Sequence, residues 1–364
     1  LMQSIIFISL IFWSFLDPTK NLWLVIAAGL VIAVSSSTQD ITIDALRIEQ
    51  IHEGRSELMA AGAAVSVVGW WTGYKIGGVI SLLSAAFFQN KGFENYWQLS
   101  FLLVSLIIVL CSLVLLLVPE NKSRQRVLAQ KLADKKILGR LGKINKLKVF
   151  FVWISGTVIN PIASFFKKNS LEVALGILGF IFLFKIGEAF LGRMSIIFYK
   201  EIGFSKIDIA FYSKGLGWIT TIAFTLLGGL FTIRMGLIKA MFVSGIVMAS
   251  TNLMFSVLAW AGNSEIIFAI AVLLDDLAAA FATVAFVAFI SVLVDRTYTA
   301  TQYALLASIG TAGRTLFASS SGALVDWLNG DWGIFFIITA LMVLPSLICL
   351  YFIKNKIKLN KKNA

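Results

Sequence analysis

The chain has 364 residues, of which 59% are hydrophobic and only 14% are charged. A soluble domain carries about a quarter of its residues as Asp, Glu, Lys and Arg, so the composition excludes a water-soluble globular protein. The net charge of +12 does not indicate nucleic-acid binding, because 12 of the 31 Lys and Arg residues lie between Glu120 and Leu171 and five more follow Ile353. Such basic loops are typical of the cytoplasmic side of membrane proteins.

Apolar runs of about 20 residues, long enough to cross ~30 Å of hydrocarbon, recur along the chain. Turn and charge signals separate them, as at Asp17-Pro18 and Pro119-Glu120. The pattern predicts an all-α polytopic membrane protein. Its ten expected spans are residues 1–16, 22–46, 58–88, 97–118, 171–199, 207–233, 237–260, 265–294, 298–327 and 332–353.

The basic loop divides the chain into two transmembrane halves. We expect an N-terminal half at residues 1–118, a basic cytoplasmic linker at 119–170, a C-terminal six-helix half at 171–353 and a basic cytoplasmic tail at 354–364. Residues 149–166 of the linker carry no charge. We interpret them as an interfacial segment rather than a span, because Asn160-Pro161 interrupts them and a crossing would invert the second half.

Four spans precede the linker and six follow it. Transporters are commonly built from two six-helix halves. Leu1 also opens directly into an apolar segment without an initiator Met. We therefore expect twelve spans in total, with the first two missing from this chain.

Apart from charged residues at the span ends, such as Lys239 and Glu265, ten charged residues fall within the predicted spans. A charge at a helix centre costs ~2.5–3.5 kcal/mol on insertion scales, so these residues must pair or face a polar cavity. They are Asp40, Asp44, Lys75, Lys185, Glu188, Arg193, Lys214, Asp275, Asp276 and Arg314.

Several of these charges admit both a structural and a functional interpretation. Asp40 and Asp44 share one helix face, and Asp44 is also placed to pair with Arg47. Lys185 and Glu188, three residues apart, either form a satisfied pair within one helix or belong to a substrate or proton site. The adjacent Asp275 and Asp276 point about 100° apart on a helix, so only one of them needs to face a cavity.

Lys75 and Arg314 occupy comparable depths in the two halves, which suits an anionic substrate. The alternative is that they neutralise Asp275 and Asp276. His52 is the only histidine and lies in a short loop, so we expect no metal centre. We also expect no cofactor and no enzymatic activity, because no nucleophile–base pair is evident.

A series of short motifs extends along almost the whole chain. The motifs are Ser37-Thr-Gln-Asp-Ile41 with Asp44-Ala45, Gly62-Ala-Ala-Val-Ser66, Gly73-Tyr-Lys-Ile-Gly77, Phe184-Lys-Ile-Gly-Glu-Ala-Phe190, Lys214-Gly-Leu216, Ala285-Phe-Val-Ala288, Thr299-Ala-Thr-Gln-Tyr-Ala-Leu305 and Gly313-Arg314. In sequence and order they resemble the motifs of the AmpG muropeptide permease family of the major facilitator superfamily.

The resemblance implies import of anhydro-muropeptides across the bacterial inner membrane, driven by the proton gradient, by a monomer surrounded by membrane lipids. The substrate-binding residues expected from it are Gln39, Lys75, Lys185, Lys214, Gln302 and Arg314. The expected proton-coupling residues are Asp40, Asp44, Glu188, Asp275 and Asp276.

The chain departs from the family's pattern at the proton-coupling positions, where Asp275-Asp276 replaces Glu-Asn and Glu188 replaces Asp. For Gln39 and Gln302 the alternative is a hydrogen bond from helix to helix. The alternative functions are transport of another organic anion, as in the related acetyl-CoA transporters, and a membrane-embedded enzyme.

Both the linker and the tail should face the cytoplasm, because 22 of the 31 cations then lie on that side and only four lie outside. An Asn360→Cys variant should therefore react with a membrane-impermeant thiol reagent only after the cells are opened. Labelling of this cysteine in intact cells would disprove the topology.

Overall fold

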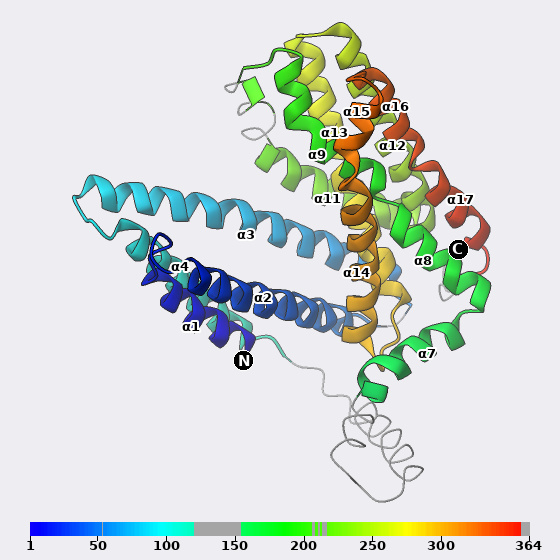
Figure 1. Ribbon diagram of the computed structural model, residues 1–364. Helices are drawn as coiled ribbons and strands as arrows, with labels where there is room; N and C mark the ends of the chain where they lie inside the picture. Colours follow the sequence, from blue (N-terminus) through cyan, green and yellow to red (C-terminus); the bar gives the residue numbers. More distant parts are fainter. Residues whose placement is uncertain (53, 120–153, 206–207, 210–211, 213–216, 358–364) are drawn as a thin grey trace, which may run out of the picture. The chain divides into compact units, whose positions relative to one another are not determined.

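The computed structural model describes the chain except for residues 53, 120–153, 206–207, 210–211, 213–216 and 358–364. Every regular element in the described part is a helix (Figure 1). The helices are α1 (Met2–Ser14), α2 (Leu22–Gln50), α3 (Ser56–Asn90), α4 (Tyr96–Leu115), the short π-helix η1 (Ser155–Ile159), α7 (Asn160–Lys168), α8 (Leu171–Leu183), α9 (Ile186–Glu201), α11 (Gly217–Met235), α12 (Leu237–Ala261), α13 (Glu265–Leu293), α14 (Thr299–Ala318), α15 (Ser321–Trp327), α16 (Trp332–Leu341) and α17 (Leu344–Ile353).

Nine of the ten predicted spans coincide with one helix or with two consecutive helices, whereas the span predicted at residues 207–233 lies partly outside the described residues and is represented by α11. Six of these stretches are long and apolar enough to cross a membrane, counted over the described residues. They are Leu22–Gln50, Tyr96–Leu115, Leu171–Glu201, Leu237–Ala261, Glu265–Leu293 and Trp332–Ile353. The number of crossings stays a prediction.

Three of the predicted spans are each split into two helices, and local chemistry accounts for two of the breaks. Pro345 stands in the first turn of α17, where its ring cannot follow the preceding turn of a continuous helix. Between α14 and α15, the hydroxyls of Ser319, Ser320 and Ser321 each donate to a backbone carbonyl three residues earlier, which competes with helical pairing. The third break, at Phe184-Lys185, separates α8 from α9.

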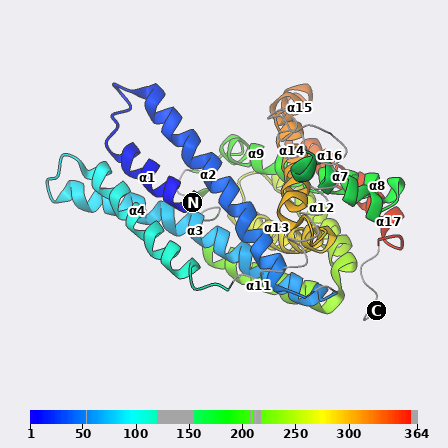
Figure 2. The same cartoon turned by 90° about the horizontal axis from the view of Figure 1, so that it is seen from below.

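The chain forms two compact units. The first comprises Leu1–Gln50 and Gly69–Lys122, in which α1 lies alongside α2 and α4 (Figure 2). Trp13 of α1 stacks on Phe101 of α4 with ring centroids 6.1 Å apart. Its ring also lies close to Gly29 of α2, where a Cβ atom would be 3.6 Å from Cη2 of the tryptophan. The α3 residue Ser84 bonds to Ser100 of α4 at 2.8 Å.

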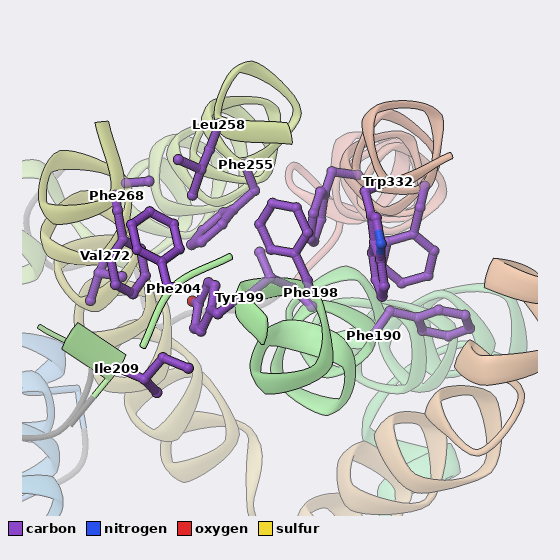
Figure 3. Close-up of a cluster of buried hydrophobic side chains, with 14 of the residues drawn as sticks. Phe190, Phe198, Tyr199, Phe204, Ile209, Phe255, Leu258, Phe268, Val272 and Trp332 are labelled. Atoms are coloured by element: carbon purple, nitrogen blue, oxygen red, sulfur yellow. The ribbon is translucent and has the colours of Figure 1, made fainter. Parts of the chain in front are cut away.

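The second unit comprises Ile51–Val68 and Ser123–Ala364. Within it, α12 packs on α13 and α16, α11 on α13, and α8 on α14 and α17. A fully buried aromatic core, with side chains from α9, α12, α13 and α16 that point toward one another, holds these helices together (Figure 3). Its closest pair, Phe204 and Phe268, has ring centroids 4.3 Å apart. Packing of this kind fixes the relative positions of the helices that carry the buried charges.

Gly187 lets α9 approach α16 and α12 more closely than any other residue would. A Cβ atom at this position would overlap the backbone carbonyl oxygen of Thr339 and would lie 3.4 Å from Nδ2 of Asn252. Asn252 itself donates to the Thr339 hydroxyl at 3.1 Å. The glycine between Lys185 and Glu188 is therefore required by backbone contact.

Gly187→Ala should lower the thermal unfolding temperature of the purified protein, because overpacking of this kind costs about 1–3 kcal/mol. Gly192→Ala on the same helix is the matched control, since a Cβ there meets nothing within 4 Å. This control should be neutral or slightly stabilising. Equal melting temperatures for the two variants would show that the close approach is not required.

Candidate functional site

Lys185 lies at the break between α8 and α9 and is only 4% exposed. Its Nζ donates to Oε2 of Glu188 at 2.6 Å and to the hydroxyl of Thr283 on α13 at 2.7 Å. An ammonium has three N–H donors, so one donor remains after these two bonds. The ion pair predicted within Lys185-Ile-Gly-Glu188 is present, and it is a buried one.

Asp275 and Asp276 on α13 diverge toward different helices. The hydroxyl of Thr251 on α12 lies 3.4 Å from Oδ1 of Asp275, and that of Thr220 on α11 lies 3.5 Å from Oδ2 of Asp276. In the described part of the chain, Asp275 makes no ion pair. The predicted divergence of the two carboxylates is confirmed, and Asp275 is a carboxylate without a cation bonded to it.

Lys185, Glu188, Asp275 and Arg314 form one electrostatic group, which we call the charged cluster. The charges of Glu188, Asp275 and Arg314 all act on the ammonium of Lys185, and that of Glu188 acts on Asp275. Arg314 lies on the exposed face of α14 and makes no ion pair among the described residues. The helix of Arg314 packs closely on α8 at Gly313. A Cβ atom at this glycine would overlap the carbonyl oxygen of Phe182.

A cluster of two carboxylates and two cations, with Asp276 beside it, can bind an anion and a proton. Lys185 offers a donor to an incoming carboxylate, and Arg314 offers a second positive charge. Asp275 offers an oxygen that no cation occupies. No cofactor or metal is needed for either step.

Gln302 is placed away from the charged cluster and is 2% exposed. Its Oε1 accepts from the backbone N–H of Asp295 at 2.6 Å, and its Nε2 donates to the carbonyl of Pro161 in α7 at 2.8 Å. The Asp295 side chain in turn accepts from Ser164 of α7 at 2.7 Å. These bonds support the helix-to-helix interpretation of Gln302, since they attach α7 to the turn before α14.

The carboxyl of Asp295 lies outside the spanning helices. Burial raises its pKa, but hydrogen bonds from Thr297 and Ser164 and the positive charge of Lys168 outweigh this effect, so the pKa is lowered below its ordinary value. Asp295 therefore binds α7 as a carboxylate. Arg296, the next residue, donates to the carbonyl of Ile51 at 2.8 Å.

The predicted site residues of the first unit have different surroundings. Asp44 accepts from both Nε and NH2 of Arg47, at 3.1 and 3.0 Å, so the pairing alternative for this carboxylate holds. Asp40 is exposed on α2, whereas Oε1 of Gln39 is buried without a hydrogen-bond donor in the described part of the chain. The Nζ of Lys75 lies 5.4 Å from the ring centroid of Trp71.

Lys214 lies outside the described residues. The roles predicted for it, and for Asp40, Gln39 and Lys75 in binding or coupling, stay predictions.

The sequence interpretation missed three threonines that accompany the buried charges. Thr283 holds Lys185, Thr251 lies against Asp275 and Thr220 against Asp276. Threonine carries no charge and occurs in many apolar helices, so composition gives little signal. The only indication in the sequence was that Thr283 lies in the same predicted span as Asp275 and Asp276.

No family model matches the chain. Over 357 residues the chain is 31% identical to a putative transporter, AmpG 4, of Rickettsia conorii, covering 98% of this chain and 79% of that relative. It is 26% identical over 362 residues to the anhydromuropeptide permease of Escherichia coli, covering 99% of this chain and 66% of that relative.

Two solved structures share the fold. One is the proton:xylose symporter XylE of the major facilitator superfamily, with a TM-score of 0.63 and 15% identity over 97% of this chain and 78% of that one. The other is the human organic anion transporter MFSD10 (TETRAN), with a TM-score of 0.57 and 15% identity over 96% of this chain and 75% of that one. The chain therefore has the major facilitator fold.

Gln302→Leu should loosen α7, because it leaves the Pro161 carbonyl and the Asp295 N–H without partners, at about 1–3 kcal/mol each. Lower thermal stability and faster hydrogen exchange in α7 are expected. Gln39→Leu is the matched control, since it removes an amide oxygen that has no donor. The structural role of Gln302 is disproved if both variants unfold at the same temperature and α7 exchanges at the normal rate.

Proposed function

The chain belongs to the AmpG family of transporters, and from this we propose that it imports anhydro-muropeptides from the periplasm to the cytoplasm by proton symport. It is a multi-pass protein of the inner membrane with the major facilitator fold. The permease relative is named for anhydromuropeptide, which supports this substrate class. Transport needs no chemical change in the solute, so we propose a carrier without enzymatic activity.

The observation that carries the proposal is the buried Lys185 with an unused donor. A charge in the membrane interior is expensive and marks a functional site by default. Glu188 and Thr283 take two of its N–H donors. The third suits a carboxylate of the peptide part of a muropeptide, because N⁺–H···O⁻ bonds are the stronger kind of hydrogen bond.

The balance of charges around this lysine couples the binding of substrate to the binding of a proton. Among the described residues, two carboxylates (Glu188 and Asp275) and two cations (Lys185 and Arg314) belong to the charged cluster. An anionic substrate adds further negative charge to a site of low dielectric, where like charges repel strongly. A proton on one of the carboxylates restores the balance, so the anion and the proton are bound together.

Asp275 is the carboxylate best placed to carry that proton. A coupling group must bind and release a proton as access alternates, and a carboxylate held in a close ion pair cannot readily do so. Glu188 and Asp44 are held in this way, by Lys185 and Arg47. Asp275 has no ion-pair partner in the described part of the chain, and Asp40 is the corresponding candidate of the first unit.

The substrate class rests on the peptide carboxylates and the sugar. Lys185 and Arg314 would bind any organic anion, so the neighbouring amides and hydroxyls must recognise the sugar. A transporter of another organic anion is the competing function, and uptake assays with both kinds of solute separate the two. Recovery of the solute unchanged inside the vesicle separates transport from enzymatic conversion.

Membrane vesicles that contain the protein should accumulate labelled anhydro-muropeptide, and an uncoupler should abolish the accumulation. Asp275→Asn should stop uphill accumulation and leave counterflow of preloaded substrate intact, because exchange needs no net proton movement. Gradient-driven uptake and counterflow are measured side by side.

Asp276→Asn is the matched control, since its carboxylate faces α11 instead of α12. It should retain uncoupler-sensitive accumulation. If Asp275→Asn, Asp276→Asn and Glu188→Gln all accumulate substrate normally, the proton travels elsewhere and Asp40 becomes the leading carboxylate. No uptake by the unmodified protein would remove the muropeptide function itself.

A further inference from the structure

Thr283 of α13 is fixed by its own hydrogen bond as an acceptor toward Lys185. Its hydroxyl donates to the backbone carbonyl of Ala279 at 2.6 Å. A hydroxyl has one proton and two lone pairs, so with the proton directed along α13 only the oxygen's lone pairs remain. Lys185 donates to this oxygen at 2.7 Å.

The two partners of Lys185 therefore differ in kind. Glu188 is a charged partner that a substrate carboxylate can replace, because both offer an anionic oxygen. Thr283 is a neutral partner that an anion cannot displace from its helix and that adds no negative charge. A buried ammonium needs acceptors throughout the cycle, and Thr283 supplies one whichever carboxylate is present.

We propose that Thr283 is a positioning residue that holds Lys185 in place while its charged partner changes. This inference rests on the proposed function of the charged cluster and adds a specific role to it. Without the threonine, Lys185 depends on carboxylates alone and remains bound to Glu188. The incoming substrate then competes less well for the lysine.

The charged groups that face Lys185 come from three neighbouring helices. Glu188 lies on α9, Asp275 lies on α13 and Arg314 lies on α14. Asp276 lies next to Asp275 on α13 and contacts α11. Loss of Thr283 leaves all four charges in place, so a change in KM reports the position of Lys185 and not the removal of a charged group.

Thr283→Val keeps the shape of the side chain and removes the acceptor, whereas Thr283→Ser restores the hydroxyl. Thr225→Val is a matched control, because Thr225 is also buried and its hydroxyl also bonds to a carbonyl four residues earlier, at 2.6 Å. No bond joins Thr225 to a charged side chain among the described residues. The comparison separates the loss of a lysine partner from the loss of a helical side-chain bond.

Initial uptake rates of labelled anhydro-muropeptide are measured against concentration. Thr283→Val should raise KM about tenfold, the effect of one hydrogen bond to a charged group, with a smaller effect on kcat. Thr283→Ser and Thr225→Val should both resemble the unmodified protein.

Three results would overturn the inference while the unmodified protein transports normally. The first is an unchanged KM in Thr283→Val. The second is a Thr283→Ser variant as impaired as Thr283→Val, which would indicate a steric role. The third is the same shift in Thr225→Val.

Thermal unfolding of the purified proteins decides the placement of Lys185 without any substrate. Thr283→Val should lower the unfolding temperature more than Thr225→Val does, because it alone deprives a buried ammonium of a partner. Equal losses would overturn the inference. Absence of uptake by the unmodified protein would instead overturn the proposed function, so the two failures are distinguishable.

Discussion

The second unit is organised around one constraint, the burial of the Lys185 ammonium. An isolated charge in a medium of low dielectric is so costly that proteins pair it or neutralise it. Here the partners come from two separate helices, with Glu188 supplying the opposite charge from α9 and Thr283 supplying a neutral acceptor from α13. The break between α8 and α9 places the lysine between them. The packing of α8, α9 and α13 in this region supplies the contacts that stabilise the buried Lys185 ammonium.

The same constraint explains why the neighbouring carboxylates are not all equivalent. Glu188 is paired with the lysine, whereas in the described part of the chain Asp275 receives only a long contact of 3.4 Å from Thr251. The paired and the unpaired carboxylate can therefore serve different functions. Arg314 adds positive charge to the cluster from the exposed face of its helix.

Hydropathy was sufficient to predict the helices, because the length of hydrocarbon to be crossed sets the length of an apolar run. The Lys185–Glu188 pair was also predictable, since residues three apart on a helix are neighbours. The divergence of Asp275 and Asp276 follows from helix geometry alone. Contacts between distant helices were harder to predict: the sequence left Gln302 open between a sugar-binding amide and a helix-to-helix hydrogen bond, and only the position of Pro161 shows that it bonds to α7. Thr283 was missed for the same reason.

Gly187 has a consequence for how the charged cluster can move. The α9 backbone contacts the Thr339 carbonyl of α16 without an intervening side chain. No side chain at this contact can change its rotamer to accommodate sliding of α9 along α16. A shift of α9 therefore moves α16 with it, so the two helices behave as one rigid unit. Lys185 and Glu188, on either side of this glycine, cannot be repositioned by turning their own helix. Any change in their exposure to one side of the membrane has to come from the tilting of a whole block of helices.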